Sequence, residues 1–179
     1  MNVRLLQRDE IHLIWQIDRR EVVENIYSLQ DGKLILKPDY FDMQGWPPGE
    51  AELYTPILLD CYDRGGTFCG AFENHRLVGV SILESNFIGS QHDMLQLKFL
   101  HVSRDYRNRG IASALFNIAV EKARSLGAKK LYISATPSEH TINYYMRLGC
   151  VLANEIDAEL FALEPEDIHL AYVIPEPTG

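Results

Sequence analysis

The chain has 179 residues, of which 46% are hydrophobic and 23% are charged, and its formal net charge is −8. This composition is typical of a soluble globular protein with one sizeable core. The acidic balance argues against nucleic acid as a main partner, because binding phosphates requires a basic face. No apolar run approaches the roughly 20 residues of a membrane span, so we expect a cytoplasmic protein without a membrane partner.

The cysteines and histidines do not suggest a metal centre. Cys61, Cys69 and Cys150 are too far apart for a metal knuckle and too few for a disulfide scaffold. The six histidines show no paired spacing of the kind that zinc ligands have. We therefore expect free thiols and no metal site.

Helices and loops dominate the prediction for the first third of the chain. A short strand is expected at 3–6. Hydrophobic periodicity then predicts helices at 9–16, 20–29 and 50–62. Asp31-Gly32 is interpreted as the end of the second helix, and a loop rich in proline, glycine and aromatic residues is expected at 37–49.

The remainder of the chain alternates between strand and helix patterns. Two apolar segments flank Asn74-His75-Arg76, which indicates a β-hairpin. The strands expected here cover 67–73, 77–83, 95–102, 131–135, 150–153 and 169–174. Helices are expected at 111–126 and 141–147. The whole pattern predicts one α+β domain with a mixed, largely antiparallel sheet.

A basic turn, Arg107-Asn108-Arg109-Gly110-Ile111-Ala112, joins the strand at 95–102 to the helix that follows. The first amides of a helix have no intrahelical partner and lie at the positive end of its dipole, so they favour a phosphate group. Gly110 allows close approach of the backbone, and the two arginines add attraction. The alternative is a surface turn with solvated arginines.

A second group of residues follows the strand at 131–135. Here a short helix carries Tyr144 and Tyr145 and ends at Gly149. The spacing of Tyr145 from Ile142 places it near the core-facing side of this helix. An isolated tyrosine in such a position is more often a packing residue whose hydroxyl bonds to a backbone carbonyl.

Together the two groups resemble the GCN5-related N-acetyltransferase (GNAT) superfamily. The turn at 107–112 matches the family's acetyl-CoA loop, Gln/Arg-x-x-Gly-x-Gly/Ala, at its fixed positions. The segment 141–150 resembles the family's Ala-Ile-x-Phe-Tyr-x-x-x-Gly-Phe signature. Good matching covers about 67–150, and the preceding part matches only in pattern.

The resemblance implies a twisted mixed sheet with helices on both faces, whose central strands separate to hold acetyl-CoA. The single N-acetyltransferase domain would comprise acceptor-side helices and loops at 1–66, the acetyl-CoA core at 67–150 and final strands at 151–174. Backbone groups would pair with the pantetheine, and the loop amides would bind the diphosphate. The residues so implied are Leu100, Val102, Arg107, Asn108, Arg109, Gly110, Ile111, Ala112, Ser113 and Ser138, the last where the family often has asparagine.

The implied reaction is direct transfer of acetyl from the thioester to a primary amine. Tyr145 is the family-matched general acid, which would protonate the leaving thiolate. Glu84 is a candidate general base, with Asp93 as another, although either carboxylate fits an ordinary solvated strand end. His101 alternates away from the side that faces acetyl-CoA and is given no catalytic role.

The acceptor expected from the acidic composition is a small-molecule amine such as a polyamine, an amino sugar, or an aminoglycoside- or streptothricin-like antibiotic. A protein or peptide amine, a non-catalytic acyl-CoA sensor and a nucleotide-binding domain are the alternatives. A homodimer is also compatible, since dimers are common in the superfamily. Residues of the first half that could line an acceptor pocket are Trp15, Asp18, Glu21, Tyr27, Tyr40 and Trp46.

Overall fold

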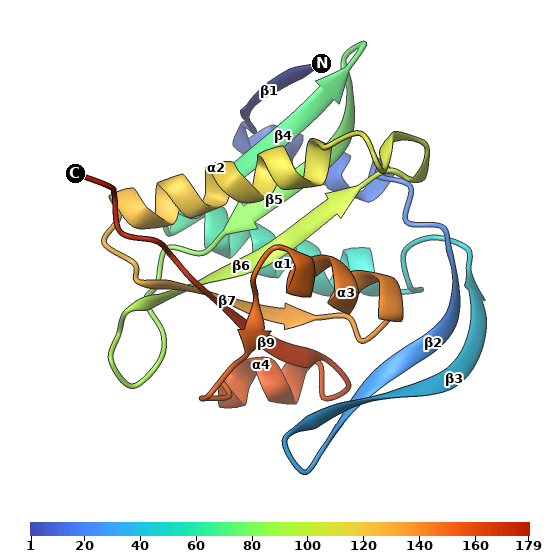
Figure 1. The fold of residues 1–179 in the computed structure, drawn as a ribbon. Coiled ribbons are helices and arrows are strands. Elements are labelled where there is room, and N and C mark those ends of the chain that lie inside the picture. Colours follow the sequence, from blue (N-terminus) through green and yellow to red (C-terminus); the bar gives the residue numbers. More distant parts are fainter.

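A seven-stranded mixed sheet runs through the molecule (Figure 1). The computed structural model describes residues 1–179. In spatial order the strands are β1 (Asn2–Leu5), β4 (Thr67–Glu73), β5 (Arg76–Leu83), β6 (Met94–Val102), β7 (Lys130–Ala135), β9 (Ile168–Val173) and β8 (Val151–Leu152). Neighbouring strands are antiparallel except β6 and β7, which are parallel. This confirms the expected α+β class with a largely antiparallel sheet.

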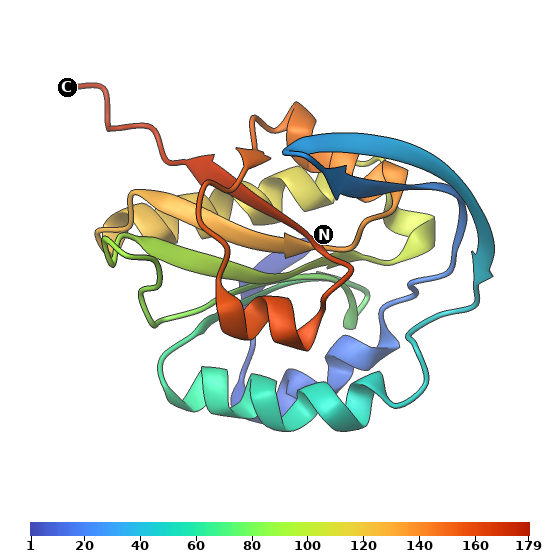
Figure 2. The ribbon, with the colours of Figure 1, turned by 90° about the horizontal axis from the view of Figure 1, so that it is seen from below.

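Helices cover both faces of the sheet (Figure 2). One face carries α2 (Ile111–Ser125) and α3 (Glu139–Arg147). The opposite face carries the 3-10 helix η1 (Arg8–Gln16) together with α1 (Glu50–Asp63) and α4 (Ala158–Leu163). A short 3-10 turn, η2 (Arg104–Tyr106), follows β6. No helix is long and apolar enough to cross a bilayer.

Each face has its own hydrophobic core. The apolar residues of α2 repeat at helical spacing, so Leu115, Ala119 and Ala123 turn toward the sheet and are buried. On the opposite face, Ile14 of η1 and Leu58 of α1 are fully buried in a second cluster. The sheet therefore lies between two separate apolar layers.

The parallel pair β6–β7 holds together only at one end. Its register covers Met94 with Lys130, Leu95 with Leu131 and Gln96 with Tyr132, and no pairing follows. On the other edge of β6, Phe99 pairs with Ile82 and Leu97 with Leu83, so Lys98 is an extra residue that forms a bulge. The bulge bends β6 where it leaves β7, and this opens the sheet.

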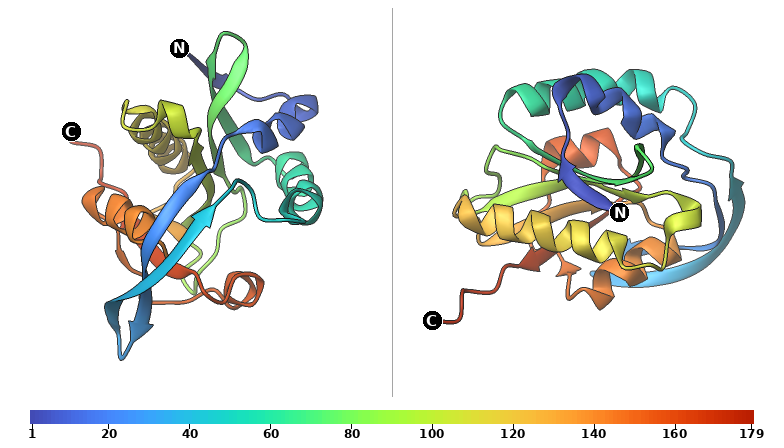
Figure 3. Two further views of the ribbon diagram at one scale, coloured as in Figure 1. Left: turned by 90° about the vertical axis from the view of Figure 1, so that its right-hand side faces the viewer. Right: turned by 90° about the horizontal axis from the view of Figure 1, so that it is seen from above.

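The largest error of the sequence analysis concerns 20–49. The predicted helix at 20–29 is the strand β2 (Glu21–Gln30), and much of the predicted loop is the strand β3 (Lys33–Met43). Asp31 and Gly32, with φ of +49° and +74°, form the tight turn between them and do not end a helix. Figure 3 shows this two-stranded ribbon curving past α3, outside the main sheet.

The other predicted elements are present within one or two residues of their expected bounds. The hairpin between β4 and β5 turns at Asn74 and His75, both of which have positive φ. Two details differ. The helix at 9–16 is a 3-10 helix, and α4, which has only six residues, was not predicted. The three cysteines are buried free thiols, as expected.

Candidate active site

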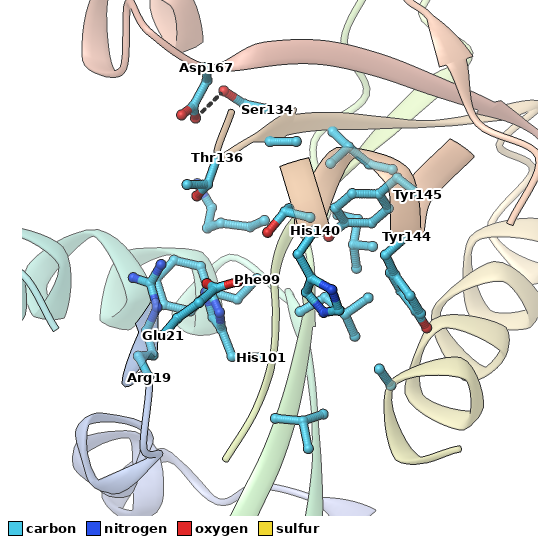
Figure 4. A pocket seen from close by; sticks show the side chains of 18 of the residues that line it. Arg19, Glu21, Phe99, His101, Ser134, Thr136, His140, Tyr144, Tyr145 and Asp167 are labelled. Carbon is cyan, nitrogen blue, oxygen red and sulfur yellow. Dashed lines mark hydrogen bonds between the residues drawn. The ribbon is translucent and has the colours of Figure 1, made fainter. Parts of the chain in front are cut away.

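A cavity of about 880 Å³ occupies the opening between β6 and β7. Its lining begins at Leu97 and Ile133, the residues that follow the last β6–β7 pair. From one face of the sheet, the start of α2 and the helix α3 line it. From the other face, α1 and the segment between α4 and β9 line it (Figure 4). The cavity therefore joins the two faces of the sheet.

At one end of the cavity lies the N-terminus of α2. Gly110 is its N-cap residue, with φ of +79°, and no side chain caps the helix. Ala114 is the first residue whose amide bonds back into the helix, to the Gly110 carbonyl at 3.0 Å. The preceding helical amides are therefore free. A Cβ at Gly110 would meet no atom outside its own loop within 4 Å, and Gly110 to Ser113 all line the cavity.

The two arginines of this loop play different parts. The Arg107 guanidinium donates hydrogen bonds to the carbonyl oxygens of Val102 (3.0 Å), Asp18 (3.3 Å) and Arg20 (3.3 Å). It therefore fastens the loop to the start of β2 while still lining the cavity. Arg109 lies over the ring of Tyr106 and does not line the cavity.

Tyr145 borders the cavity from α3. Its side chain is buried, yet its hydroxyl has no hydrogen-bond partner in the protein, unlike that of Tyr144, which lies 3.1 Å from Ser113 Oγ. The bond to a backbone carbonyl that a packing tyrosine would make is thus not formed. Burial raises the pKa of Tyr145, and Cys150 and Tyr144 add to the effect. The hydroxyl stays protonated at neutral pH and is available to donate.

Ser138 does not reach the cavity. It is buried at the start of α3, where its hydroxyl donates to Thr141 Oγ1 at 2.8 Å. Its neighbours Pro137, His140 and Thr141 line the cavity instead. The expected contact between Ser138 and the cofactor is therefore not supported, because this side chain is buried and bonds to Thr141.

Glu84 also lies outside the cavity. Both its carboxylate oxygens accept hydrogen bonds from Arg64, at 2.9 and 3.0 Å, and Lys98 Nζ lies 3.9 Å away. Burial pushes its pKa up, but the hydrogen bonds from Arg64 and Cys61 outweigh burial and leave the pKa lowered. Glu84 is thus an ion-pair partner and is badly placed to be the general base. Asp93 does not line the cavity either.

The end of the cavity that faces α1 and α4 is acidic. Four carboxylates line it: Glu50, Glu164, Glu166 and Asp167. Tyr54 donates to Glu164 at 2.9 Å, Ser134 donates to Asp167 at 2.8 Å, and Arg19 lies 3.5 Å from Glu50. Burial raises the pKa of Asp167 to about 6, assisted by the negative charges of Glu164 and Glu50. Burial also raises the pKa of Glu50.

This acidic end has no signature in the sequence, because its residues are far apart in the chain. Glu50 and Glu164 are brought together only by the packing of α1 beside the segment before β9. Of the aromatic and acidic residues proposed for an acceptor pocket, Glu21 lines the cavity. Most of the others hold structure; Trp15, for example, donates to Thr55 at 3.0 Å.

His101 is placed differently from the expectation. It does alternate away from Leu100 and Val102, but the face that it reaches borders the same cavity (Figure 4). The expectation treated the cavity as one-sided, whereas it passes through the sheet. The position of His101 in the cavity lining is therefore compatible with a role in the reaction, contrary to the expectation.

No group of three or more histidine, cysteine, aspartate or glutamate side chains is arranged to hold a metal ion. The cavity offers an anion site at the α2 N-terminus, an unpaired phenol, the imidazoles of His101 and His140, and a carboxylate-lined end. These parts lie along one continuous passage.

Solved structures share this fold over nearly the whole chain. Nourseothricin acetyltransferase aligns with 18% identity and a TM-score of 0.73, over 97% of this chain and 98% of its own. A Bacillus anthracis protein provisionally named a streptothricin acetyltransferase, in complex with acetyl coenzyme A, aligns with 13% identity and a TM-score of 0.67, over 95% of both chains. Aminoglycoside 6'-N-acetyltransferase, complexed with coenzyme A, aligns with 17% identity and a TM-score of 0.57, over 74% of this chain and 87% of its own.

At these identities the structures show a common fold and no more. No curated protein matches the sequence significantly. The profile of the acetyltransferase (GNAT) family, in contrast, matches residues 29–150, which is more than half of the chain. The chain therefore belongs to the GNAT acetyltransferase family.

Proposed function

We propose that the protein is an N-acetyltransferase that moves an acetyl group from acetyl-CoA directly to a primary amine of a small cationic molecule. The observation that carries this proposal is the passage through the sheet. It has an anion-binding helix N-terminus and an unpaired tyrosine hydroxyl toward one face, and carboxylates at the other. A donor and an acceptor can thus enter from opposite faces and meet between β6 and β7.

The α2 end fits acetyl-CoA by its chemistry. Free amides at a helix N-terminus favour a diphosphate, and the open space at Gly110 admits it without a clash. From Leu97 on, the edge of β6 that faces β7 has no neighbouring strand. The backbone groups of Leu100 and the Val102 N–H are therefore available to an extended pantetheine chain, which would pair as an added strand does, whereas the Val102 carbonyl already accepts from Arg107.

The chemistry follows from this placement. The amine nitrogen bonds to the thioester carbonyl carbon and loses a proton, and the carbon–sulfur bond then breaks. Tyr145 supplies a proton to the departing thiolate, which is the role that its unpaired hydroxyl suits. None of the buried cysteines lines the cavity, which agrees with direct transfer and no acetyl-enzyme.

The acidic end supports a cationic acceptor. Carboxylates in a partly desolvated cavity attract a positive group and lose part of their mutual repulsion when it binds. The cavity volume is in the range of small-molecule sites. A polyamine, an amino sugar, or an aminoglycoside- or streptothricin-like antibiotic has the required charges and size. The names of the structural relatives agree with this class of acceptor.

The proposal is tested in two stages. Acetyl-CoA should raise the melting temperature of the purified protein, whereas ATP or NAD at equal concentration should not, since ligand at 100 times its Kd stabilises by about 2.7 kcal/mol. Release of free CoA thiol is then measured with a panel of polyamines, amino sugars, aminoglycosides and streptothricin, with neutral amines and peptides as controls. No shift with acetyl-CoA would refute the donor. A shift without turnover on any acceptor would favour the sensor alternative.

A further inference from the structure

The bulge in β6 decides where His101 points. With Lys98 as the extra residue, Phe99 and His101 lie on the face of α1, while Leu97, Leu100 and Val102 contact the clusters on the face of α2. The backbone proposed to pair with acetyl-CoA thus carries, between Leu100 and Val102, one side chain that enters the acceptor side of the cavity. That side chain is an imidazole (Figure 4).

The ring of His101 is held by aromatic neighbours and not by hydrogen bonds. Phe99 and Trp46 each contact it edge to face, with ring centroids 5.1 Å away. Trp46 is itself fixed, because its indole N–H donates to the Ile17 carbonyl at 2.9 Å and the Arg19 guanidinium lies over its ring. A ring positioned so firmly has a defined direction.

Neither nitrogen of this half-buried imidazole has a hydrogen-bond partner in the protein. The ring borders the cavity, so a bound molecule with a donor N–H can supply that partner.

Three of the carboxylates that line the cavity already have partners. Glu164 accepts from Tyr54, Asp167 accepts from Ser134, and Glu50 is paired with Arg19. These groups belong to α1 and to the segment before β9, as does Glu166. Glu21 and His140, which also line the cavity, belong to β2 and α3. Among the histidine and carboxylate side chains of the lining, His101 is therefore the one carried by β6, the strand along which the thioester would lie.

We propose that His101 is the general base of the transfer; this rests on the proposed function. As the acceptor nitrogen bonds to the acetyl carbon, its proton passes to the imidazole, and the carbon–sulfur bond breaks as Tyr145 protonates the thiolate. The imidazolium returns its proton through solvent to the Tyr145 phenolate after the products leave. One proton leaves the amine and one reaches CoA, so the cycle balances.

The charges around the ring suit this exchange. Burial, followed by the guanidinium groups of Arg19 and Arg107, lowers the pKa of His101 well below its ordinary value, so the imidazole is neutral before the reaction. Glu21 from β2 and Glu50 from α1 lie on the same side of the cavity and offset the arginine charges when the ring becomes cationic. An amine nitrogen becomes acidic once it bonds to the carbonyl carbon, so a weak base suffices.

The test is His101→Ala, assayed with an acceptor on which the wild-type protein turns over. We expect turnover to fall by about 10²- to 10⁴-fold, while the acetyl-CoA thermal shift stays unchanged. Added imidazole should restore part of the rate, and substituted imidazoles should restore more as their pKa rises. His12→Ala, at an exposed histidine of η1 outside the cavity, should behave as the wild type and gain nothing from imidazole.

Full turnover in His101→Ala would overturn the proposal, and so would a loss that no imidazole restores. His101→Gln, which keeps a polar side chain of similar size, provides the same assay if the alanine variant does not fold. Failure of the proposed function is distinguishable, because the wild-type protein would then show no turnover with any acceptor.

Discussion

Asp167→Asn should make the protein more stable and less able to bind its acceptor. The carboxyl lies in the acidic end of the cavity, where burial and the charges of Glu164 and Glu50 raise its pKa to about 6. An unfolded aspartate titrates near pH 4, at about 3.9. Between these two values the folded protein binds more protons than the unfolded chain, so its stability falls as the pH rises.

The size of the change in stability follows from the difference of about two units between the folded and unfolded pKa of Asp167. At about 1.4 kcal/mol per pKa unit, the ionised carboxyl destabilises the fold by at most about 3 kcal/mol at pH 7.5. Partial contact with solvent in the cavity reduces this value, and we expect about 1–3 kcal/mol. Asparagine has nearly the same shape, and its amide oxygen can still accept the hydrogen bond from Ser134.

Urea unfolding of the two proteins at pH 4 and pH 7.5 measures this contribution. The asparagine variant should be more stable at pH 7.5, and most of its advantage should disappear at pH 4, where the folded wild type is protonated at this position. Carboxylates that do not interact with Asp167 titrate equally in both proteins and cancel in the difference. An equal gain in stability at both pH values, or a loss at pH 7.5, would refute the conclusion that folding raises the pKa of Asp167.

Three further variants test other parts of the site. Tyr145→Phe should keep the acetyl-CoA thermal shift but lose turnover by at least about tenfold, measured as CoA release; full activity would remove Tyr145 from the mechanism. Gly110→Ala should lower stability by about 1–2 kcal/mol because of its positive φ, and titration calorimetry should show weaker acetyl-CoA binding, because the new Cβ enters the space proposed for the diphosphate. Glu84→Gln should destabilise by about 1–3 kcal/mol in urea unfolding through its weakened bonds to Arg64. Its turnover per folded molecule should not change; a large loss would restore Glu84 as a candidate base.

The donor side of the fold was predictable because its signals are local. The helix after Gly110 has apolar residues at helical spacing over four turns, and a glycine with positive φ begins it. The strand before it is mostly apolar, and all of its residues are buried or half-buried. In such segments the residues that pack and the residues that form the loop are neighbours in the chain, so one short stretch specifies both.

The ribbon of β2 and β3 shows where local signals fail. The segment 21–30 has apolar residues at positions that fit a helix as well as a strand, and Asp31-Gly32 suits either a helix end or a hairpin turn. Tertiary contacts decide between them: Asn25 donates to Glu139, Tyr27 donates to Asn143, and the Tyr27 amide bonds to the Pro137 carbonyl. These partners lie more than 100 residues away and carry no signature in the segment itself.

The donor side and the acceptor side of the cavity differ in the same way, because one is contiguous in sequence and the other is not. The parts assigned to the donor lie between Leu97 and Tyr145, in one continuous stretch of β6, α2, β7 and α3. The acceptor end combines α1 with the segment before β9, and its carboxylates sit on elements that contribute little to the other face of the sheet. Substitution at Glu50, Glu164 or Asp167 can therefore change the charge that the acceptor must carry without disturbing the α2 N-terminus.

His101 belongs to both halves, because its backbone is part of the donor strand and its ring faces the acceptor. A variant at His101 should for that reason affect every acceptor alike, whereas variants of the carboxylates should discriminate among acceptors by charge.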